Sequence, residues 1–146
     1  MLFLREKNVV LAVHSAKAPT DAEWGTFMEL LREVSPRELR ILAITDGGSP
    51  NVHHRALLNE YMAGAEPPIS VVSSSLTVRG VATAISWFNK RIRAFDPAHI
   101  DSAFDHIGFA PAERSAWLQR ATKLAVELDG AVESLDRAAG SVRKRA

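Results

Sequence analysis

The chain has 146 residues, of which 47% are hydrophobic and 24% charged, and its formal net charge is +1. This length and composition predict one compact domain with a substantial core, and the near-neutral charge argues against nucleic acid as a partner. The absence of cysteine excludes disulfide bonds, thiolate catalysis and cysteine-ligated metals, and it is compatible with a reducing cytoplasm.

The sequence shows no pattern of membrane targeting. Its apolar start, residues 1–4, is followed at once by charged residues, unlike the start of a signal peptide. No window approaches the roughly 20 apolar residues that a membrane-spanning helix requires. We therefore expect a soluble, cytoplasmic protein without a membrane partner.

The first quarter of the chain predicts two strands and a helix. Residues 1–4 favour an edge strand, and the apolar run of residues 9–13 is typical of a buried strand. Thr20 and Glu23 form a capping box, in which each side chain accepts a hydrogen bond from the other residue's backbone N–H. The helix that follows should bury one apolar face, which consists of Trp24, Phe27, Met28, Leu31 and Val34.

A central segment predicts a strand, a glycine turn and a second helix. The apolar run of residues 39–44 is short, as expected of a strand covered on both faces. The glycine pair at residues 47–48 then predicts a tight turn. Ser49 is expected to cap the next helix with its hydroxyl. Pro50 suits the first helical position, because its missing N–H would have no partner there.

The pattern of strand and helix repeats twice more. Residues 69–72 favour a strand, and residues 77–88 favour a helix with apolar side chains on one side. Residues 91–95 give a shorter and weaker strand signal. Asp96 and Pro97 then predict the cap and first position of a fourth helix.

The fourth helix closes at Gly108 and no strand signal follows it, which divides the chain into an α/β domain, residues 1–108, and a helical extension, residues 109–146. Apolar side chains in the extension recur at alternating spacings of four and three, at Trp117, Ala121, Leu124, Leu128, Ala131, Leu135 and Ala138. Gly130 interrupts this seam. The seam favours either a helix packed on the domain or a self-association helix that would make a homodimer. The basic end, residues 141–146, is expected to be solvated.

Strand and helix alternate about four times, which predicts an α/β fold with a mainly parallel sheet of four to five strands flanked by helices. Right-handed crossovers place the ends of parallel strands along one edge, where ligands and partners bind in open α/β sheets. The segments expected at that edge are Ser15, residues 46–49, residues 73–75 and Asp96.

Two segments of this edge are candidate sites for an anion or a partner. The turn of Gly47 and Gly48 offers flexible backbone amides in front of a helix, although it lacks the lysine and the spacing of a P-loop. A neighbouring polar cradle would combine hydroxyls with one cation, from Ser73, Ser74, Ser75, Thr77 and Arg79. The simpler interpretation is that the glycines permit a tight turn and that Asp46 and the hydroxyls satisfy backbone donors.

Other chemistry has less support. The five histidines lack the spacing of metal ligands, so we expect neither a metal nor a cofactor. Ser49, His14 and Asp46 can be drawn as a triad, but the sequence around Ser49 is not a nucleophile elbow, so we expect no catalytic residues and no enzyme. A basic–aromatic patch combines Lys90, Arg91, Arg93, Trp87 and Phe88. In a near-neutral protein such a patch is more typical of a helix end and a solvated strand edge than of a nucleic-acid site.

The order of the elements, with a strand that ends in Asp46 and a hydroxyl at Ser49 before the next helix, resembles the STAS-like fold. That fold occurs in anti-sigma-factor antagonists and in the cytoplasmic tails of sulfate transporters. The resemblance covers roughly residues 1–108 and implies a bacterial signalling domain in which a partner kinase can phosphorylate Ser49. The sequence departs from the family's usual loop, because two glycines separate Asp46 from Ser49 and Pro50 follows.

We therefore expect a non-catalytic regulatory or scaffolding domain that binds a protein partner through the loop edge around Asp46 and Ser49, with Ser49 as a phospho-switch. The alternative is a small-ligand or nucleotide sensor that uses the glycine turn and the cradle of residues 73–79. The residues expected to bind a partner or an anion are Asp46, Gly47, Gly48, Ser49, Ser74, Ser75 and Arg79.

Overall fold

Five β-strands form one sheet whose spatial order follows the order of the chain. The computed structural model describes residues 1–85, 89–128 and 132–143. The strands are β1 (Leu2–Glu6), β2 (Val9–His14), β3 (Arg40–Thr45), β4 (Ile69–Val72) and β5 (Ile92–Phe95). β1 pairs with β2 in an antiparallel hairpin, and β2 to β5 run parallel. The expected α/β fold with a mainly parallel sheet is confirmed.

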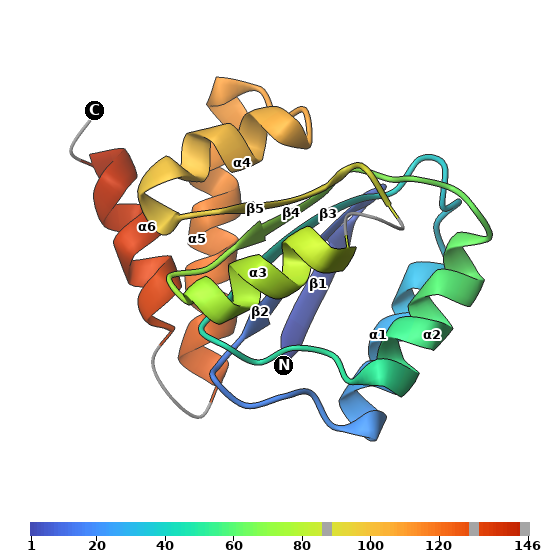
Figure 1. Ribbon diagram of the computed structural model, residues 1–146. Helices are drawn as coiled ribbons and strands as arrows, with labels where there is room; N and C mark the ends of the chain where they lie inside the picture. The colour runs from blue at the N-terminus through green and yellow to red at the C-terminus, as the bar shows by residue number, and fades with distance from the viewer. Residues whose placement is uncertain (86–88, 129–131, 144–146) are drawn as a thin grey trace.

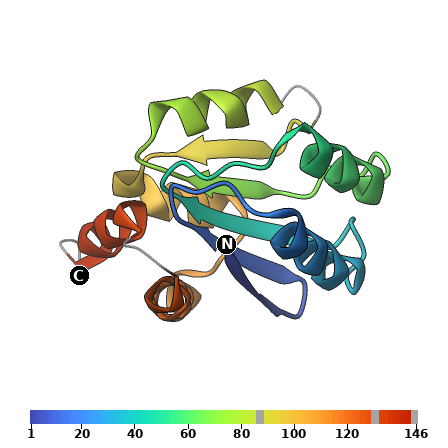
Figure 2. The same cartoon turned by 90° about the horizontal axis from the view of Figure 1, so that it is seen from below.

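Two helical layers cover the sheet. On one side lie α1 (Asp21–Arg32) and α2 (Val52–Met62), and on the other lie α4 (Ile100–His106), α5 (Pro111–Glu127) and α6 (Glu133–Arg143), as Figure 1 shows. α3 (Leu76–Ile85) packs along β5 at the edge of the sheet (Figure 2). Because the strand order never reverses, right-handed connections bring α1, α2 and α3 to the same face of the sheet.

The residues of β2 alternate between the two layers. Val10 and Ala12 pack into a core with the apolar face of α1, whereas Leu11 and Val13 pack into a second core with α4, α5 and α6. All six residues of β2 are buried. This double burial explains why the strand reads as a continuous apolar run rather than as an alternating one.

The predicted apolar seam after residue 108 forms two helices rather than one. In α5, Trp117 and Ala121 are buried against the sheet, and in α6, Leu135 and Ala138 enter the same core. Both helices therefore cover the sheet, as the packed alternative predicts, and self-association stays a prediction. Gly130 and Ala131 lie outside the described residues, as do residues 144–146 of the basic end.

Local capping signals were partly right. The capping box of Thr20 and Glu23 is present at the start of α1. The prediction for Ser49 and Pro50 was wrong, because the N-cap of α2 is Asn51, whose side chain accepts a hydrogen bond of 2.8 Å from the His54 N–H. An amide oxygen two residues further along thus takes the role assigned to the Ser49 hydroxyl.

The predicted fourth helix differs in extent from the structure. Asp96 caps a short 3-10 turn, η1 (Pro97–His99), and α4 follows it. The predicted end of the helix at residues 86–88 lies outside the described residues, as do Trp87 and Phe88 of the basic–aromatic patch. None of the described helices is both long and apolar enough to cross a membrane.

If α6 is an integral part of the core, truncating its buried leucine should be costly. Leu135→Ala should lower the free energy of unfolding by about 2 to 5 kcal/mol, because the side chain is 2% exposed and leaves a cavity. Val126→Ala on α5 is the matched control, since Val126 is 81% exposed and should change stability by no more than about 0.5 kcal/mol. Urea denaturation would measure both, and equal effects would contradict the assignment.

Candidate functional site

The ends of the parallel strands gather at one edge of the sheet, as the sequence predicted. His14 lies beside Thr45 in the β2–β3 register, and Val72 lies beside Phe95 in the β4–β5 register. Just beyond β4, the Ser73 N–H donates to the Phe95 carbonyl at 3.0 Å. The loops that follow β2, β3, β4 and β5 therefore meet at this edge.

Asp46 faces the N-terminus of α6. Its carboxylate accepts hydrogen bonds from the backbone N–H groups of Glu133, at 2.5 Å, and Ser134, at 2.8 Å. The Ser134 hydroxyl in turn donates to the Thr45 carbonyl at 3.1 Å. The first N–H groups of a helix have no acceptor within the helix, and a carboxylate is favourable at its positive end. Asp46 therefore caps α6 from a distant part of the chain.

The predicted cradle is occupied by hydrogen bonds within the protein. The Ser74 N–H donates to the Ser134 hydroxyl at 2.9 Å, and the Ser75 hydroxyl accepts from the Val78 N–H at 3.3 Å. Arg79 forms an ion pair with Asp96 at 2.5 Å. These contacts give Ser74, Ser75 and Arg79 structural roles within the protein.

Gly47 and Gly48 are explained by the shape of the turn. Gly47 has a φ of 145°, which side chains rarely adopt. A Cβ on Gly48 would lie 2.1 Å from the Lys17 carbonyl oxygen, so the loop after β2 leaves room only for glycine. The Gly48 N–H donates to the Ser15 carbonyl at 3.0 Å and the Gly47 N–H to the Thr45 hydroxyl at 3.2 Å. Both amides are thus already hydrogen-bonded.

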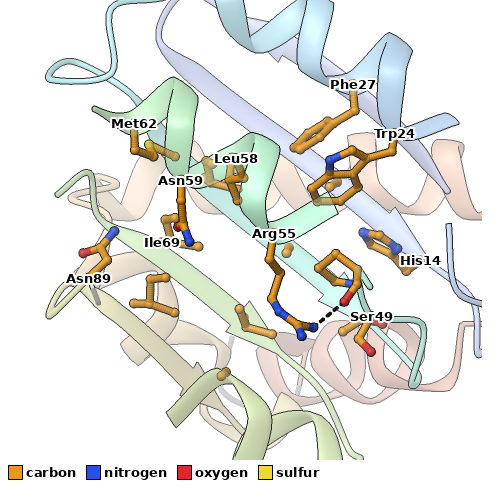
Figure 3. A pocket seen from close by; sticks show the side chains of 18 of the residues that line it. His14, Trp24, Phe27, Ser49, Arg55, Leu58, Asn59, Met62, Ile69 and Asn89 are labelled. Atoms are coloured by element: carbon orange, nitrogen blue, oxygen red, sulfur yellow. Dashed lines mark hydrogen bonds between the residues drawn. The ribbon is translucent and has the colours of Figure 1, made fainter. Parts of the chain in front are cut away.

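A cavity of about 460 Å³ lies next to this turn, between α2 and α3 (Figure 3). Its floor is formed by alternate residues of β3 and β4, which are Ile41, Ala43, Thr45, Ile69 and Val71. Leu58 and Met62 of α2 face Val78 and Ala82 of α3 across it. Of the sequence-predicted site residues, Gly48 and Ser49 line this cavity. The site is therefore a mainly apolar space beside the strand-end loops.

Polar side chains stand at the two ends of the cavity, and Asn59 of α2 lies between them, beside Leu58 and Met62 (Figure 3). His14 and Arg55 lie towards the loop that carries Ser49, and Asn89 lies at the opposite end (Figure 3). The Arg55 guanidinium donates a hydrogen bond of 2.6 Å to the Pro50 carbonyl. None of the described residues that line the cavity is Asp, Glu or Lys. Arg55 is therefore the positive group of an apolar space without an acidic wall residue.

His14 is held neutral at the loop end of the cavity. It is 6% exposed, and its Nδ1 atom has no hydrogen-bond partner among the described residues. Burial, and to a lesser extent the N-terminal ammonium, lower the pKa of His14 from 6.5 to about 4, while Glu23 acts in the opposite direction. The imidazole consequently carries no charge at neutral pH.

His54 fixes the wall of the cavity and was missed in the sequence. Its ring is 1% exposed, stacks on Trp24 at a centroid distance of 4.9 Å, and lies 2.8 Å from an Asp21 carboxylate oxygen. These contacts join α2 to α1. The sequence did contain a signal for this role. His54 lies four residues before Leu58 and seven before Tyr61, so the helical period puts it on the inward face of α2.

The described residues hold no assembly typical of a metal site or a triad. No group of three or more histidine or acidic side chains in the described part of the chain could hold a metal ion. Asp46 is directed to α6 rather than to His14. Comparison of the chain with protein-family models, with curated proteins and with solved structures found no match. The functional argument therefore rests on the geometry of the cavity.

Removing the Asp46 carboxylate should loosen α6. Asp46→Ala should lower the free energy of unfolding by about 1 to 3 kcal/mol and should speed hydrogen exchange at the Glu133 and Ser134 amides, because both lose a charged acceptor. Glu29→Ala, which removes an exposed carboxylate from α1, is the control. Unchanged exchange at those two amides would rule out the cap.

The buried neutral imidazole should make stability fall in mild acid. The unfolded chain takes up a proton on His14 near pH 6.5, but the folded chain does so only near pH 4. The contribution is therefore complete above pH 6.5 and is lost as the pH falls to 4, by up to about 3 kcal/mol. Urea titrations of the wild type and His14→Gln between these pH values would measure it, and parallel pH profiles would contradict it.

Proposed function

We propose that this chain is a non-catalytic regulatory domain of the STAS-like kind that senses a small, mainly apolar molecule bound in the cavity between α2 and α3. The observation that carries the proposal is the cavity itself. Its volume of about 460 Å³ falls in the range of about 300 to 1,000 Å³ typical of small-molecule sites. Its apolar lining with a few polar groups is also typical of such sites.

This proposal keeps the small-ligand sensor that the sequence offered as an alternative, but it places the ligand site elsewhere. The glycine amides and the serine cradle have partners within the protein, which disfavours a nucleotide held by those groups. The apolar floor of β3 and β4 instead offers burial to a ligand without phosphate groups. We therefore assign the ligand to the cavity rather than to the turn and cradle.

A physical connection between the cavity and the loop edge supports a regulatory role. Gly48, Ser49 and Pro50 line the cavity, while Asp46 in the same turn holds the N-terminus of α6. A ligand that shifts this turn would change the surface that the edge presents to a protein partner. Such a shift requires that the ligand bind one arrangement of the turn better than another.

We propose Ser49 as the residue at which a partner kinase or a bound partner acts. It is half-buried at the cavity wall, and its hydroxyl forms no hydrogen bond with the residues that the structure describes. Phosphate there would add about two negative charges near the Arg55 guanidinium. The lack of cysteine supports the proposal that the protein acts in the cytoplasm.

Filling the cavity should abolish binding of an apolar probe without unfolding the protein. We expect the uncharged dye Nile red to bind the wild type saturably, and Ala43→Phe to remove this binding because the ring occupies the space above the floor of β3. Ala56→Phe places the same ring on the exposed side of α2 and is the matched control. Fluorescence titration would measure the binding, and thermal melts would confirm that both variants fold.

Two results would contradict the proposal. Nile red could fail to bind the wild type saturably, in which case the cavity is not a ligand site. Alternatively, Ala43→Phe and Ala56→Phe could retain the same affinity, which would place the dye elsewhere on the surface.

A further inference from the structure

Arg55 differs from four other arginines of the described chain in the kind of partner it has, and like Arg40 it donates to a backbone carbonyl. Arg5, Arg79, Arg114 and Arg120 each form an ion pair with a carboxylate. Arg55 has no such pair among the described residues, and its guanidinium donates a hydrogen bond to the Pro50 carbonyl. Yet it is half-buried and extends from α2 along an apolar cavity, with its guanidinium towards the loop that carries Ser49 (Figure 3). A partly desolvated cation in this position lacks its counterion.

The chemistry of the guanidinium indicates what would complete the site. The group carries five N–H donors, of which one is used by Pro50. Its planar fork matches a carboxylate, and the charge-assisted hydrogen bonds are strengthened where water is excluded. Arg55 therefore favours an anionic head group on the ligand.

The number of charges restricts that head group further. Arg55 is the one guanidinium among the described lining residues, and no lysine stands beside it. A phosphate dianion would keep one charge uncompensated, whereas a carboxylate is matched by a single cation. The neutral state of His14 leaves this balance unchanged at neutral pH.

The floor of the cavity indicates the rest of the ligand. On β3 it runs from Thr45, near the loop end, to Ile41, a distance of about 13 Å for four residues of a strand. Beyond Thr45 the side chains along it, Ala43 and Ile41, are apolar, and Leu58 and Met62 of α2 continue the apolar wall in the same direction. An unbranched hydrocarbon chain would bury its surface along this path.

From these observations we propose that the cavity binds an amphipathic monocarboxylic acid, with its carboxylate paired to Arg55 and its hydrocarbon chain extended over β3 and β4 towards Asn89. This inference rests on the proposed function, because it names the ligand class of the same cavity. It predicts a preference for an acid over an alcohol of equal chain length.

Displacement of Nile red by decanoate and by decanol tests the preference. The wild type should bind decanoate at least about tenfold more tightly than decanol near neutral pH. Arg55→Met should weaken the affinity for decanoate by about the same factor. It should change the affinity for decanol by less than about twofold, because the apolar methionine side chain preserves the wall of the cavity. Arg37→Met removes one exposed cation at the opposite end of β3 and should change neither affinity.

The outcomes separate this inference from the proposed function. If Nile red binds but the wild type holds decanoate and decanol equally, or if Arg55→Met leaves decanoate affinity unchanged, the carboxylate inference is overturned and the apolar cavity remains. If Nile red does not bind the wild type, the proposed function itself fails. Should Arg55→Met not fold, Arg55→Gln and the salt dependence of decanoate binding to the wild type test the same pairing. If the carboxylate pairs with Arg55, the affinity for decanoate should fall as the salt concentration rises.

Discussion

The carboxylate of Asp46 connects the two faces of this molecule. Asp46 directly follows β3, and its carboxylate accepts hydrogen bonds from the Glu133 and Ser134 N–H groups of α6 on one side of the sheet. The residues that follow it in the turn, Gly48 to Pro50, line the cavity on the other side. One short turn thus serves both as the acceptor for the last helix and as the end wall of the binding space, which makes it the natural element to transmit a change between them.

The cavity follows from how α2 is held. The ring of His54 stacks on Trp24, and the Tyr61 hydroxyl lies 2.8 Å from the Leu31 carbonyl and 2.7 Å from the Val34 carbonyl, so α2 is attached to α1. α3 instead packs along β5. The other described helices, α4, α5 and α6, pack on the opposite face of the sheet. The floor between the two helices therefore remains available to a ligand, next to the Arg55 side chain.

Much of the fold could be predicted because its signals are local, whereas the site depends on contacts that are not. The apolar run of β2 and the capping box at Thr20 are each contained in a few residues. The cap at Asn51 shows the limit of such signals, because two residues near each other could both have capped α2. The bond from Asp46 to Ser134 joins positions 88 residues apart, and no sequence pattern indicated it. Arg55 likewise reads as an ordinary helical cation until the floor beneath it is known.

The central claim, that the space between α2 and α3 is the ligand site, is tested most directly by nuclear Overhauser effects between a bound probe and methyl-labelled protein. With decanoate as the probe, the account predicts contacts from the hydrocarbon chain to the methyl groups of Ile69 and Met62, which line the cavity. Contacts confined to exposed side chains such as Val126 and Leu76 would contradict it.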